Sequence, residues 1–209
     1  MPVVVYAEST PNPAAMKFVA NKMLLENPSP LEFLNPADAK SSPLAMELFK
    51  FPFVKSVFIS GNYITVFKDD KLDWDDIILE LREFLRIYLS DQKPILNPSR
   101  REGLAEPSDT AKNGFNSPPS GELEGAIDHV EPQGELEIKI VNVLEQYIRP
   151  AVEQDGGMIV FRSFKDGVVS LTMRGACSGC PSSTSTLKGG IEALLKKFVP
   201  EVREVVSEV

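Results

Sequence analysis

Sulfur and imidazole metal ligands are scarce in this chain of 209 residues, which has only two cysteines and one histidine. Positive charge is not in surplus either, since 22 Lys and Arg stand against 30 Asp and Glu and the formal net charge is −8. Nucleic-acid phosphates and anionic lipid surfaces attract basic faces. This balance therefore argues against nucleic acid and against a membrane surface as partners.

Long apolar runs and targeting signals are missing as well. No stretch approaches the roughly 20 apolar residues that are needed to span a bilayer. The first residues, Met1-Pro2-Val3-Val4-Val5-Tyr6, show neither the pattern of a secretory signal nor the Arg- and Ser-rich composition of a transit peptide. We therefore expect a cytoplasmic protein, in which thiols stay reduced. A structural disulfide between the two cysteines is then a poor default.

Proline and glycine recur through residues 91–133, where apolar residues are sparse and show no period. Such a segment cannot bury enough apolar surface to offset the entropy lost on ordering, so it is predicted to be a flexible linker. A structureless loop of this length is improbable inside one compact domain. The sequence thus predicts an α+β protein with two small α+β domains, residues 1–90 and residues 134–209, joined by a long linker.

Both domains are expected to mix short strands with helices, because alternating and helical apolar patterns follow each other along the chain. Ser42 and Pro43 have the residue types of a helix start. Pro150 is expected to kink or break the helix around it. In the first domain the predicted strands are 3–6, 16–24, 54–59 and 63–68, and the predicted helices are 43–49 and 73–89. In the second domain the predicted helices are 135–154 and 182–198, and the predicted strands are 158–164, 168–173 and 202–206.

The two cysteines lie three positions apart in Gly175-Ala176-Cys177-Ser178-Gly179-Cys180-Pro181, between a predicted strand and a predicted helix. A helix N-terminus favours the thiolate form of a nearby cysteine, and the thiolate is the form that binds metal and attacks disulfides. The glycines allow the backbone to turn tightly around a bound group. The motif is compatible with a metal or cluster site, a redox pair, or two thiols without function.

The number of ligands bears on the choice among these possibilities. Zinc and iron–sulfur clusters generally take four protein ligands, and one chain offers only Cys177 and Cys180, since His129 falls in the predicted linker and is interpreted as solvated. Two chains related by a two-fold axis can complete the set. A thiol–disulfide oxidoreductase with Cys177 as nucleophile is the alternative, although this domain is short for a thioredoxin-like sheet. A zinc-stapled dimer is a third possibility.

The residues around the cysteines resemble the C-terminal domain of NifU and of the Nfu proteins, and the first domain resembles the Nfu N-terminal domain. In the second domain the resemblance is carried by Ile148-Arg149-Pro150, Asp155-Gly156-Gly157, the segment from Met173 to Ser183, and Thr186-Leu187-Lys188-Gly189-Gly190-Ile191-Glu192. In the first domain it is carried by Thr10-Pro11-Asn12-Pro13, Lys17-Phe18, Ser42-Pro43-Leu44-Ala45 and Ile64-Thr65-Val66.

The resemblance implies a carrier of a labile [4Fe-4S] cluster rather than an enzyme, with Cys177 and Cys180 at the positions of the cluster ligands. Four thiolates also hold a [2Fe–2S] cluster, and the larger type is chosen from the family alone. The expected partners are apo iron–sulfur client proteins, an upstream cluster scaffold and a second copy of the chain on cluster binding. The first domain is expected to dock clients or scaffolds. Asp155-Gly156-Gly157 is interpreted as a turn only, and Lys188 as part of a solvated helix face.

Overall fold

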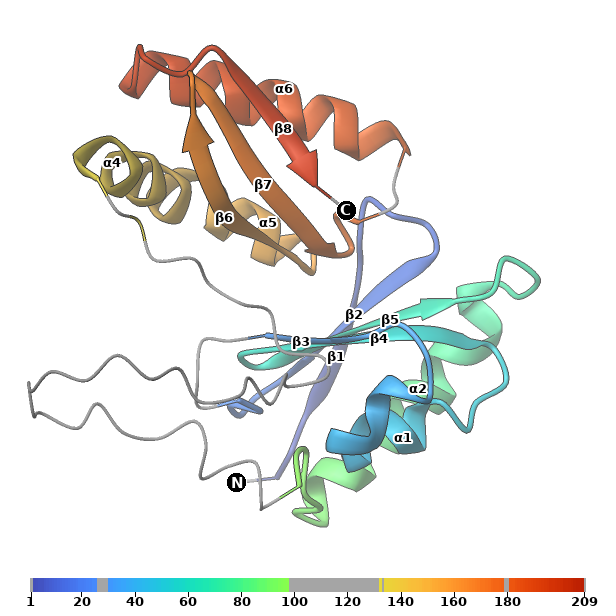
Figure 1. Cartoon of the computed structure of the whole chain (residues 1–209). Helices are drawn as coiled ribbons and strands as arrows, with labels where there is room; N and C mark the ends of the chain where they lie inside the picture. Colours follow the sequence, from blue (N-terminus) through green and yellow to red (C-terminus); the bar gives the residue numbers. More distant parts are fainter. Residues whose placement is uncertain (1, 26–29, 98–131, 133, 179–180, 209) are drawn as a thin grey trace, which may run out of the picture.

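The computed structural model describes residues 2–25, 30–97, 132, 134–178 and 181–208. They form two small α+β domains, as the sequence predicts (Figure 1). Most of the predicted linker lies outside the described residues, and so does Cys180. Within the described residues, no helix combines the length and the apolar composition that crossing a membrane requires.

The first domain is built on a five-stranded antiparallel sheet in the order β1-β2-β5-β4-β3. Helices α1 and α2 cover one face of this sheet, and the second domain lies on the other side of it (Figure 1). The predicted hairpin is β4 and β5, and both predicted helices are present. The sequence did not indicate the short edge strand β3. The strands are β1 (Val5–Ser9), β2 (Ala15–Ala20), β3 (Leu31–Phe33), β4 (Val54–Ser60) and β5 (Tyr63–Lys68), and the helices are η1 (Asp38–Ser41), α1 (Pro43–Leu48) and α2 (Trp74–Ser90).

The start of α1 confirms the predicted cap. The Ser42 hydroxyl accepts a hydrogen bond from the Ala45 N–H at 3.2 Å and donates one to the Ile95 carbonyl at 2.7 Å. Pro43 occupies the first turn, where its missing N–H costs nothing. One buried side chain therefore satisfies the helix N-terminus and ties it to the segment that follows α2.

Both faces of the first sheet are used, because side chains alternate between faces along a strand. On β2 and β5, Phe18 and Val66 belong to the core beneath the helices. Their neighbours Lys17 and Thr65 are also buried, but their polar atoms reach the second domain. A sheet of this kind separates an apolar core on one side from a polar docking face on the other.

The second domain packs its helices on one face of a three-stranded sheet, in which β6 and β7 are antiparallel and β8 is parallel to β7. The parallel pair needs a crossover, which α6 provides. The sequence predicted all three strands, and the C-terminal one begins two residues later than expected. The elements are α4 (Glu135–Val143), η3 (Leu144–Ile148), α5 (Arg149–Gln154), β6 (Gly157–Lys165), β7 (Val168–Gly175), α6 (Pro181–Phe198) and β8 (Glu204–Glu208).

Pro150 interrupts the first long helix of this domain, as expected. The helix widens into a π-helical turn over residues 144–148 and resumes as α5 with Pro150 in its first turn. Proline lacks the N–H that the preceding turn would accept, and its ring clashes with the carbonyl four residues earlier. The wider turn removes this conflict.

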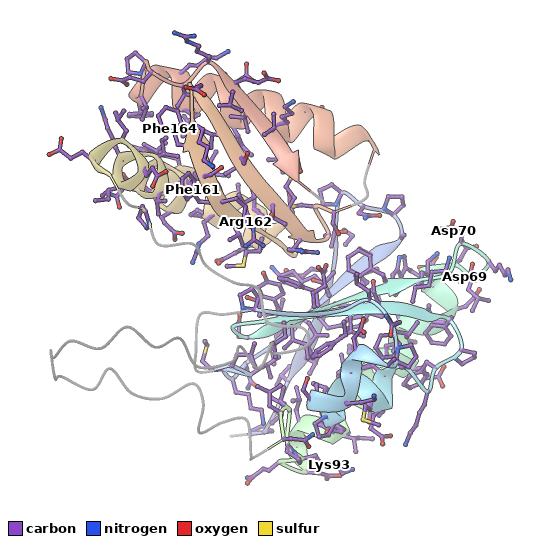
Figure 2. The ribbon with its side chains drawn as sticks, viewed as in Figure 1. Asp69, Asp70, Lys93, Phe161, Arg162 and Phe164 are labelled. Atoms are coloured by element: carbon purple, nitrogen blue, oxygen red, sulfur yellow. The ribbon has the colours of Figure 1, made fainter. Side chains whose placement is uncertain are left out.

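A bulge on β6 explains how two aromatic residues three positions apart share one core. The register with β7 shifts between Phe161 and Ser163, at Arg162. Strict alternation would send Phe161 and Phe164 to opposite faces, whereas a bulge resets the alternation. Both rings accordingly pack in the core of the second domain. Figure 2 labels Phe161, Arg162 and Phe164.

Candidate cysteine-loop site

Cys177 lies two residues beyond the end of β7, in the turn that leads toward α6. Gly175 ends the strand with a φ of +62°, a conformation that favours glycine. Its carbonyl accepts hydrogen bonds from the Ser178 N–H and the Ser178 hydroxyl, both at 2.8 Å. The turn is therefore closed by its own residues, and Cys177 is held at only 5% exposure.

Gly157 makes room for the Cys177 sulfur. A β-carbon at position 157 would come within 2.6 Å of the Sγ and within 2.9 Å of the Arg174 carbonyl. No side chain fits at such distances without movement of the loop. The Asp155-Gly156-Gly157 segment, which the sequence suggested was a turn only, is thus the wall against which the cysteine packs.

Gly156 connects the Asp155-Gly156-Gly157 segment to the backbone of the turn at residues 175–178, called the cysteine loop below. Its φ is +78°, and its carbonyl accepts a hydrogen bond from the Ala176 N–H at 3.2 Å. The same carbonyl accepts a second hydrogen bond, at 2.7 Å, from the hydroxyl of Thr65 in the first domain. The carbonyl therefore links the two loops of the second domain and the docking face of the first.

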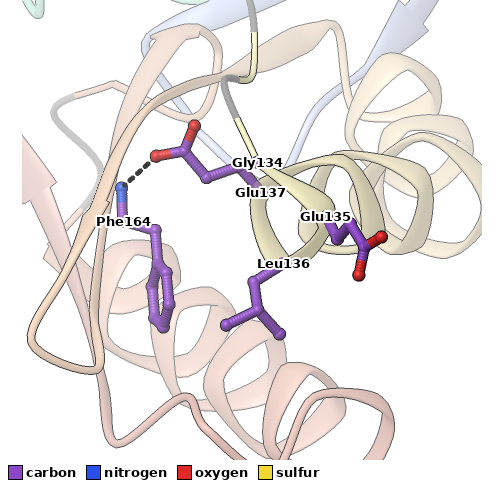
Figure 3. Close-up of a pocket in the computed structure, with 5 residues that line it drawn as sticks. All are labelled: Gly134, Glu135, Leu136, Glu137 and Phe164. Atoms are coloured by element: carbon purple, nitrogen blue, oxygen red, sulfur yellow. Dashed lines mark hydrogen bonds between the residues drawn. The ribbon is translucent and has the colours of Figure 1, made fainter.

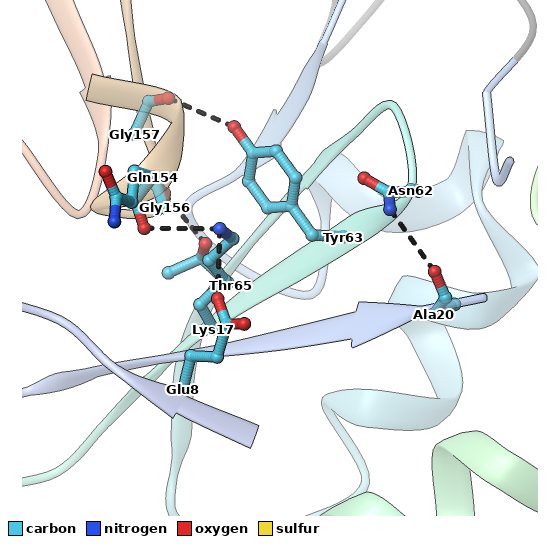
Figure 4. A network of polar contacts seen from close by, with 9 residues as sticks. All are labelled: Glu8, Lys17, Ala20, Asn62, Tyr63, Thr65, Gln154, Gly156 and Gly157. Carbon is cyan, nitrogen blue, oxygen red and sulfur yellow. Dashed lines mark hydrogen bonds and ion pairs between the residues drawn. The ribbon is translucent and has the colours of Figure 1, made fainter. Parts of the chain in front are cut away.

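Three more side chains of the first domain donate hydrogen bonds to this region, and Figure 4 shows those of Tyr63 and Lys17. The Tyr63 hydroxyl donates to the Gly157 carbonyl at 3.1 Å, the Lys17 ammonium donates to the Gln154 carbonyl at 3.2 Å, and the Asn12 amide donates to the Ala176 carbonyl at 3.3 Å. Burial raises the pKa of Tyr63 well above its ordinary value, so the phenol stays protonated and able to donate. All three acceptors are main-chain carbonyls.

The edge strand β3 adds a charged clasp on the other side of the loop. Glu32 pairs with the Arg174 guanidinium at 3.1 Å and also accepts a hydrogen bond from the Gly175 N–H at 3.1 Å. Burial raises the pKa of Glu32, while the Gly175 N–H and the Arg174 charge act in the opposite direction. One carboxylate thus holds two consecutive residues of the strand that leads into Cys177.

An apolar contact completes the boundary between the domains. Phe58 and Tyr63 of the first sheet form one buried cluster with Met158 and Val160 of β6. The Phe58 ring also lies close to Gly175, where a β-carbon would come within 3.1 Å of it. Alternate residues of β6 thus face the first domain, whereas Ile159 and Phe161 face the core of their own domain.

A hollow of ≈ 570 Å³ opens beside Cys177. Helix α6 and the π-helical turn contribute most of its walls, with Leu187, Leu194 and Tyr147 among the lining residues, and Pro11 reaches it from the first domain. Tyr147 stacks on Phe198 with their ring centroids 5.0 Å apart. The surroundings of the cysteine are therefore mostly apolar, which would shield a bound inorganic group from water.

A second hollow of ≈ 360 Å³ lies at the start of α4 (Figure 3). Its residues include Leu136, Glu137 and Phe164, and Glu137 accepts a hydrogen bond from the Phe164 N–H at 3.3 Å. This bond attaches the helix to β6. The hollow has the chemistry of a packing contact rather than of a ligand site.

The described residues contain no group of three or more His, Cys, Asp and Glu side chains that could hold a metal ion. His129 and Cys180 are not among them. Of the predicted ligands the structure thus places Cys177 alone. Lys188, expected on a solvated face, lies 4.0 Å from the Glu204 carboxylate on β8.

Sequence reasoning missed the contribution of the first domain to this site. Lys17 and Thr65 appeared only as part of the resemblance, and Glu32 and Tyr63 were given no role. A usable signal was present, since Lys17 and Thr65 are polar residues in the middle of largely apolar strand segments. Such residues on a central strand indicate that the second face of the sheet meets a polar surface.

Comparison with known proteins decides the family. Residues 5–92 match the family model described as "Scaffold protein Nfu/NifU N terminal", and residues 140–206 match the one described as "NifU-like domain". A human protein named "NFU1 iron-sulfur cluster scaffold homolog, mitochondrial" is 34% identical over 202 residues, which cover 96% of this chain and 70% of the relative. The chain belongs to the Nfu family of NifU-like proteins. The resemblance noted in the sequence is thereby confirmed.

The chain is also similar to a second curated relative and to a solved structure. A relative of the same name from Drosophila willistoni is 34% identical over 201 residues, covering 96% of this chain but only 62% of the relative. The chain thus spans about two thirds of the length of these curated relatives. A solution structure of a NifU-like protein from Saccharomyces cerevisiae covers 46% of this chain and 86% of that one, with 22% identity and a TM-score of 0.42. The relatives are named mitochondrial, and a cytoplasmic location stays a prediction.

Proposed function

We propose that this Nfu protein is a carrier of an iron–sulfur cluster, which two copies of the chain hold between them and pass to apo-proteins. The observation that carries the proposal is the combination of family and ligand count. The relatives are named iron–sulfur cluster scaffolds, and this chain has only two cysteines. Half a set of thiolates per chain favours a shared cluster.

The position of Cys177 suits this role. Cys177 lies in the turn between β7 and α6. The apolar hollow beside it would exclude water from a bound cluster. Transfer is then an exchange of ligands: thiolates of the client replace Cys177 and Cys180, and each released carrier thiolate takes up a proton. Iron and sulfide keep their oxidation states, so no reductant is needed.

The test is anaerobic reconstitution of the full chain with iron and sulfide. We expect a dimer with about four iron and four sulfide, the stoichiometry of one [4Fe-4S] cluster, and a matching Mössbauer spectrum. Replacing either Cys177 or Cys180 by Ser should abolish retention, whereas Ser178→Ala should not. A full cluster on a monomer would contradict the shared site.

Two other outcomes would favour the alternatives. Zinc at one per dimer, with no iron retained after reconstitution, would indicate a structural zinc site. Catalytic turnover with a dithiol reductant in the absence of iron would indicate a thiol–disulfide oxidoreductase. A mixed disulfide trapped by Cys180→Ser would support the same conclusion, because the resolving thiol would then be missing.

A further inference from the structure

The contacts between the domains gather on the backbone around Cys177. Hydrogen bonds from Asn12, Tyr63 and Thr65 end on the carbonyls of residues 176, 157 and 156. The Glu32 carboxylate accepts the N–H of residue 175. The first domain thus binds the main chain of both loops that enclose the sulfur.

This interface has the composition of one that can open. It combines a small apolar cluster around Phe58 with hydrogen bonds and the ion pair of Glu32 and Arg174. Interfaces between domains of one chain resemble transient protein–protein interfaces and are more polar than permanent ones. Water can replace the partners of these carbonyls and of Glu32 when the domains separate, so the net cost of opening is moderate.

The closed arrangement conflicts with a cluster shared by two chains. A thiolate that binds a shared cluster must face the other copy, whereas Cys177 is 5% exposed and its sulfur packs against Gly157. Asn12 of the first domain bonds the carbonyl of Ala176, one residue before Cys177. Pro11 lines the hollow beside Cys177. In this state the loop is occupied by the chain's own first domain.

We propose that the first domain is a built-in cover of the cysteine loop, and that it must release the loop before Cys177 becomes accessible. The inference has one consequence that rests on the proposed function: the first domain must release the loop before a cluster is taken up or delivered. The closed state itself is a property of the cluster-free chain and can be tested without iron. Its main contacts are the Glu32 clasp, the Tyr63 and Thr65 hydroxyls, and the Lys17 ammonium.

The test measures how fast iodoacetamide alkylates Cys177 in the 209-residue chain. A Cys180→Ser background leaves Cys177 as the one thiol, and intact mass follows the reaction. When opening is fast relative to alkylation, the rate is proportional to the open fraction. Loss of a charge-assisted contact or of two buried hydrogen bonds should raise the rate about tenfold. We expect this for Glu32→Ala and for the double variant Tyr63→Phe/Thr65→Val, and a smaller rise for Lys17→Met.

The matched control is Glu83→Ala. It also removes a carboxylate paired with an arginine, since Glu83 lies 2.6 Å from Arg86. The pair sits on the exposed side of α2, so the alkylation rate should not change. Rates in denaturant, where every variant is open, correct for any difference in thiol reactivity. Circular dichroism checks that each variant keeps its fold.

Unchanged alkylation rates in the folded variants would overturn the proposal that the first domain covers Cys177. A rise confined to Glu32→Ala would overturn it too, because local loosening of Gly175 would then be sufficient. If Glu32→Ala fails to fold, the conservative double variant and Lys17→Met decide the matter. If the variants are alkylated faster as expected but the chain retains no cluster, the proposed cover is supported and the proposed carrier function is contradicted. If the chain loads a cluster normally but alkylation is unchanged in the variants, the carrier function is supported and the cover is excluded.

Discussion

The Thr65 hydroxyl donates to the Gly156 carbonyl at 2.7 Å, across the boundary between the domains. The same carbonyl accepts the Ala176 N–H, one residue before Cys177. Position 156 therefore has a double requirement: a left-handed φ of +78°, and no β-carbon, since one would lie 2.9 Å from the Thr65 oxygen. A segment that resembles an ordinary turn in the sequence is fixed by contacts from both domains.

Gly157→Ala is predicted to displace the Cys177 sulfur. The added methyl would come within 2.6 Å of Sγ and 3.0 Å of the Cys177 nitrogen, so the loop must move. Forcing a methyl into a packed site costs about 1–3 kcal/mol. We expect a lower free energy of unfolding in urea and fewer iron atoms retained per chain after reconstitution. Unchanged stability together with full iron retention would contradict this account of the site.

Gly189→Ala is predicted to raise the stability of the fold without affecting iron retention, and it serves as the matched control for Gly157→Ala. Gly189 lies inside α6 on the exposed surface, and a β-carbon there would meet no atom within 4 Å. Alanine in an unobstructed helix interior stabilises by about 0.5–1 kcal/mol relative to glycine. The melting temperature should rise, and iron retention should stay at the wild-type level. A fall in stability would mean that this face of α6 is not open.

Ser42→Ala is predicted to destabilise the first domain. The hydroxyl is fully buried and makes two hydrogen bonds, to the Ala45 N–H and to the Ile95 carbonyl. Loss of an N-cap costs about 1 kcal/mol, and the carbonyl left without its donor adds to this. Urea unfolding followed by the fluorescence of Trp74 measures the change. Ser90→Ala, at the exposed end of α2, should be nearly neutral, and an equal loss there would argue against the cap.

Much of the fold could be predicted because its elements carry local signals. The hairpin β4–β5 has strand-forming residues on both sides of a glycine turn, and α2 shows apolar residues at helical spacing. The start of α1 is indicated by Ser42 and Pro43. Strand β3 was missed because three residues give too short a pattern, and its pairing with β4 is a long-range contact.

The site could be predicted only in part for the same reason. The Cys177 motif is contiguous in the sequence and has a recognisable spacing. The docking contacts are not, since Glu32 and Arg174, or Thr65 and Gly156, are far apart along the chain. No single-sequence pattern states which loop a polar face will meet. Gly157 is informative only once the sulfur beside it is placed.

Glu192 is predicted to make the second domain sensitive to acid. Its carboxylate lies 2.5 Å from the Lys196 ammonium and accepts the Val205 N–H at 3.1 Å, which ties α6 to β8. The hydrogen bond from Lys196 and then that from Val205 lower the pKa of Glu192 below its ordinary value of 4.5. A carboxyl whose pKa is lower in the folded state stabilises the fold above its unfolded value, and this stability is lost as the pH falls through the folded pKa. A carbon-13 titration of the Glu192 carboxyl should therefore show a midpoint below 4.5, and Lys196→Gln should move it upward. Because the Val205 N–H remains in that variant, the midpoint of the variant should not exceed 4.5. A wild-type midpoint at or above 4.5 would contradict the hydrogen bonds that connect α6 to β8 through Glu192.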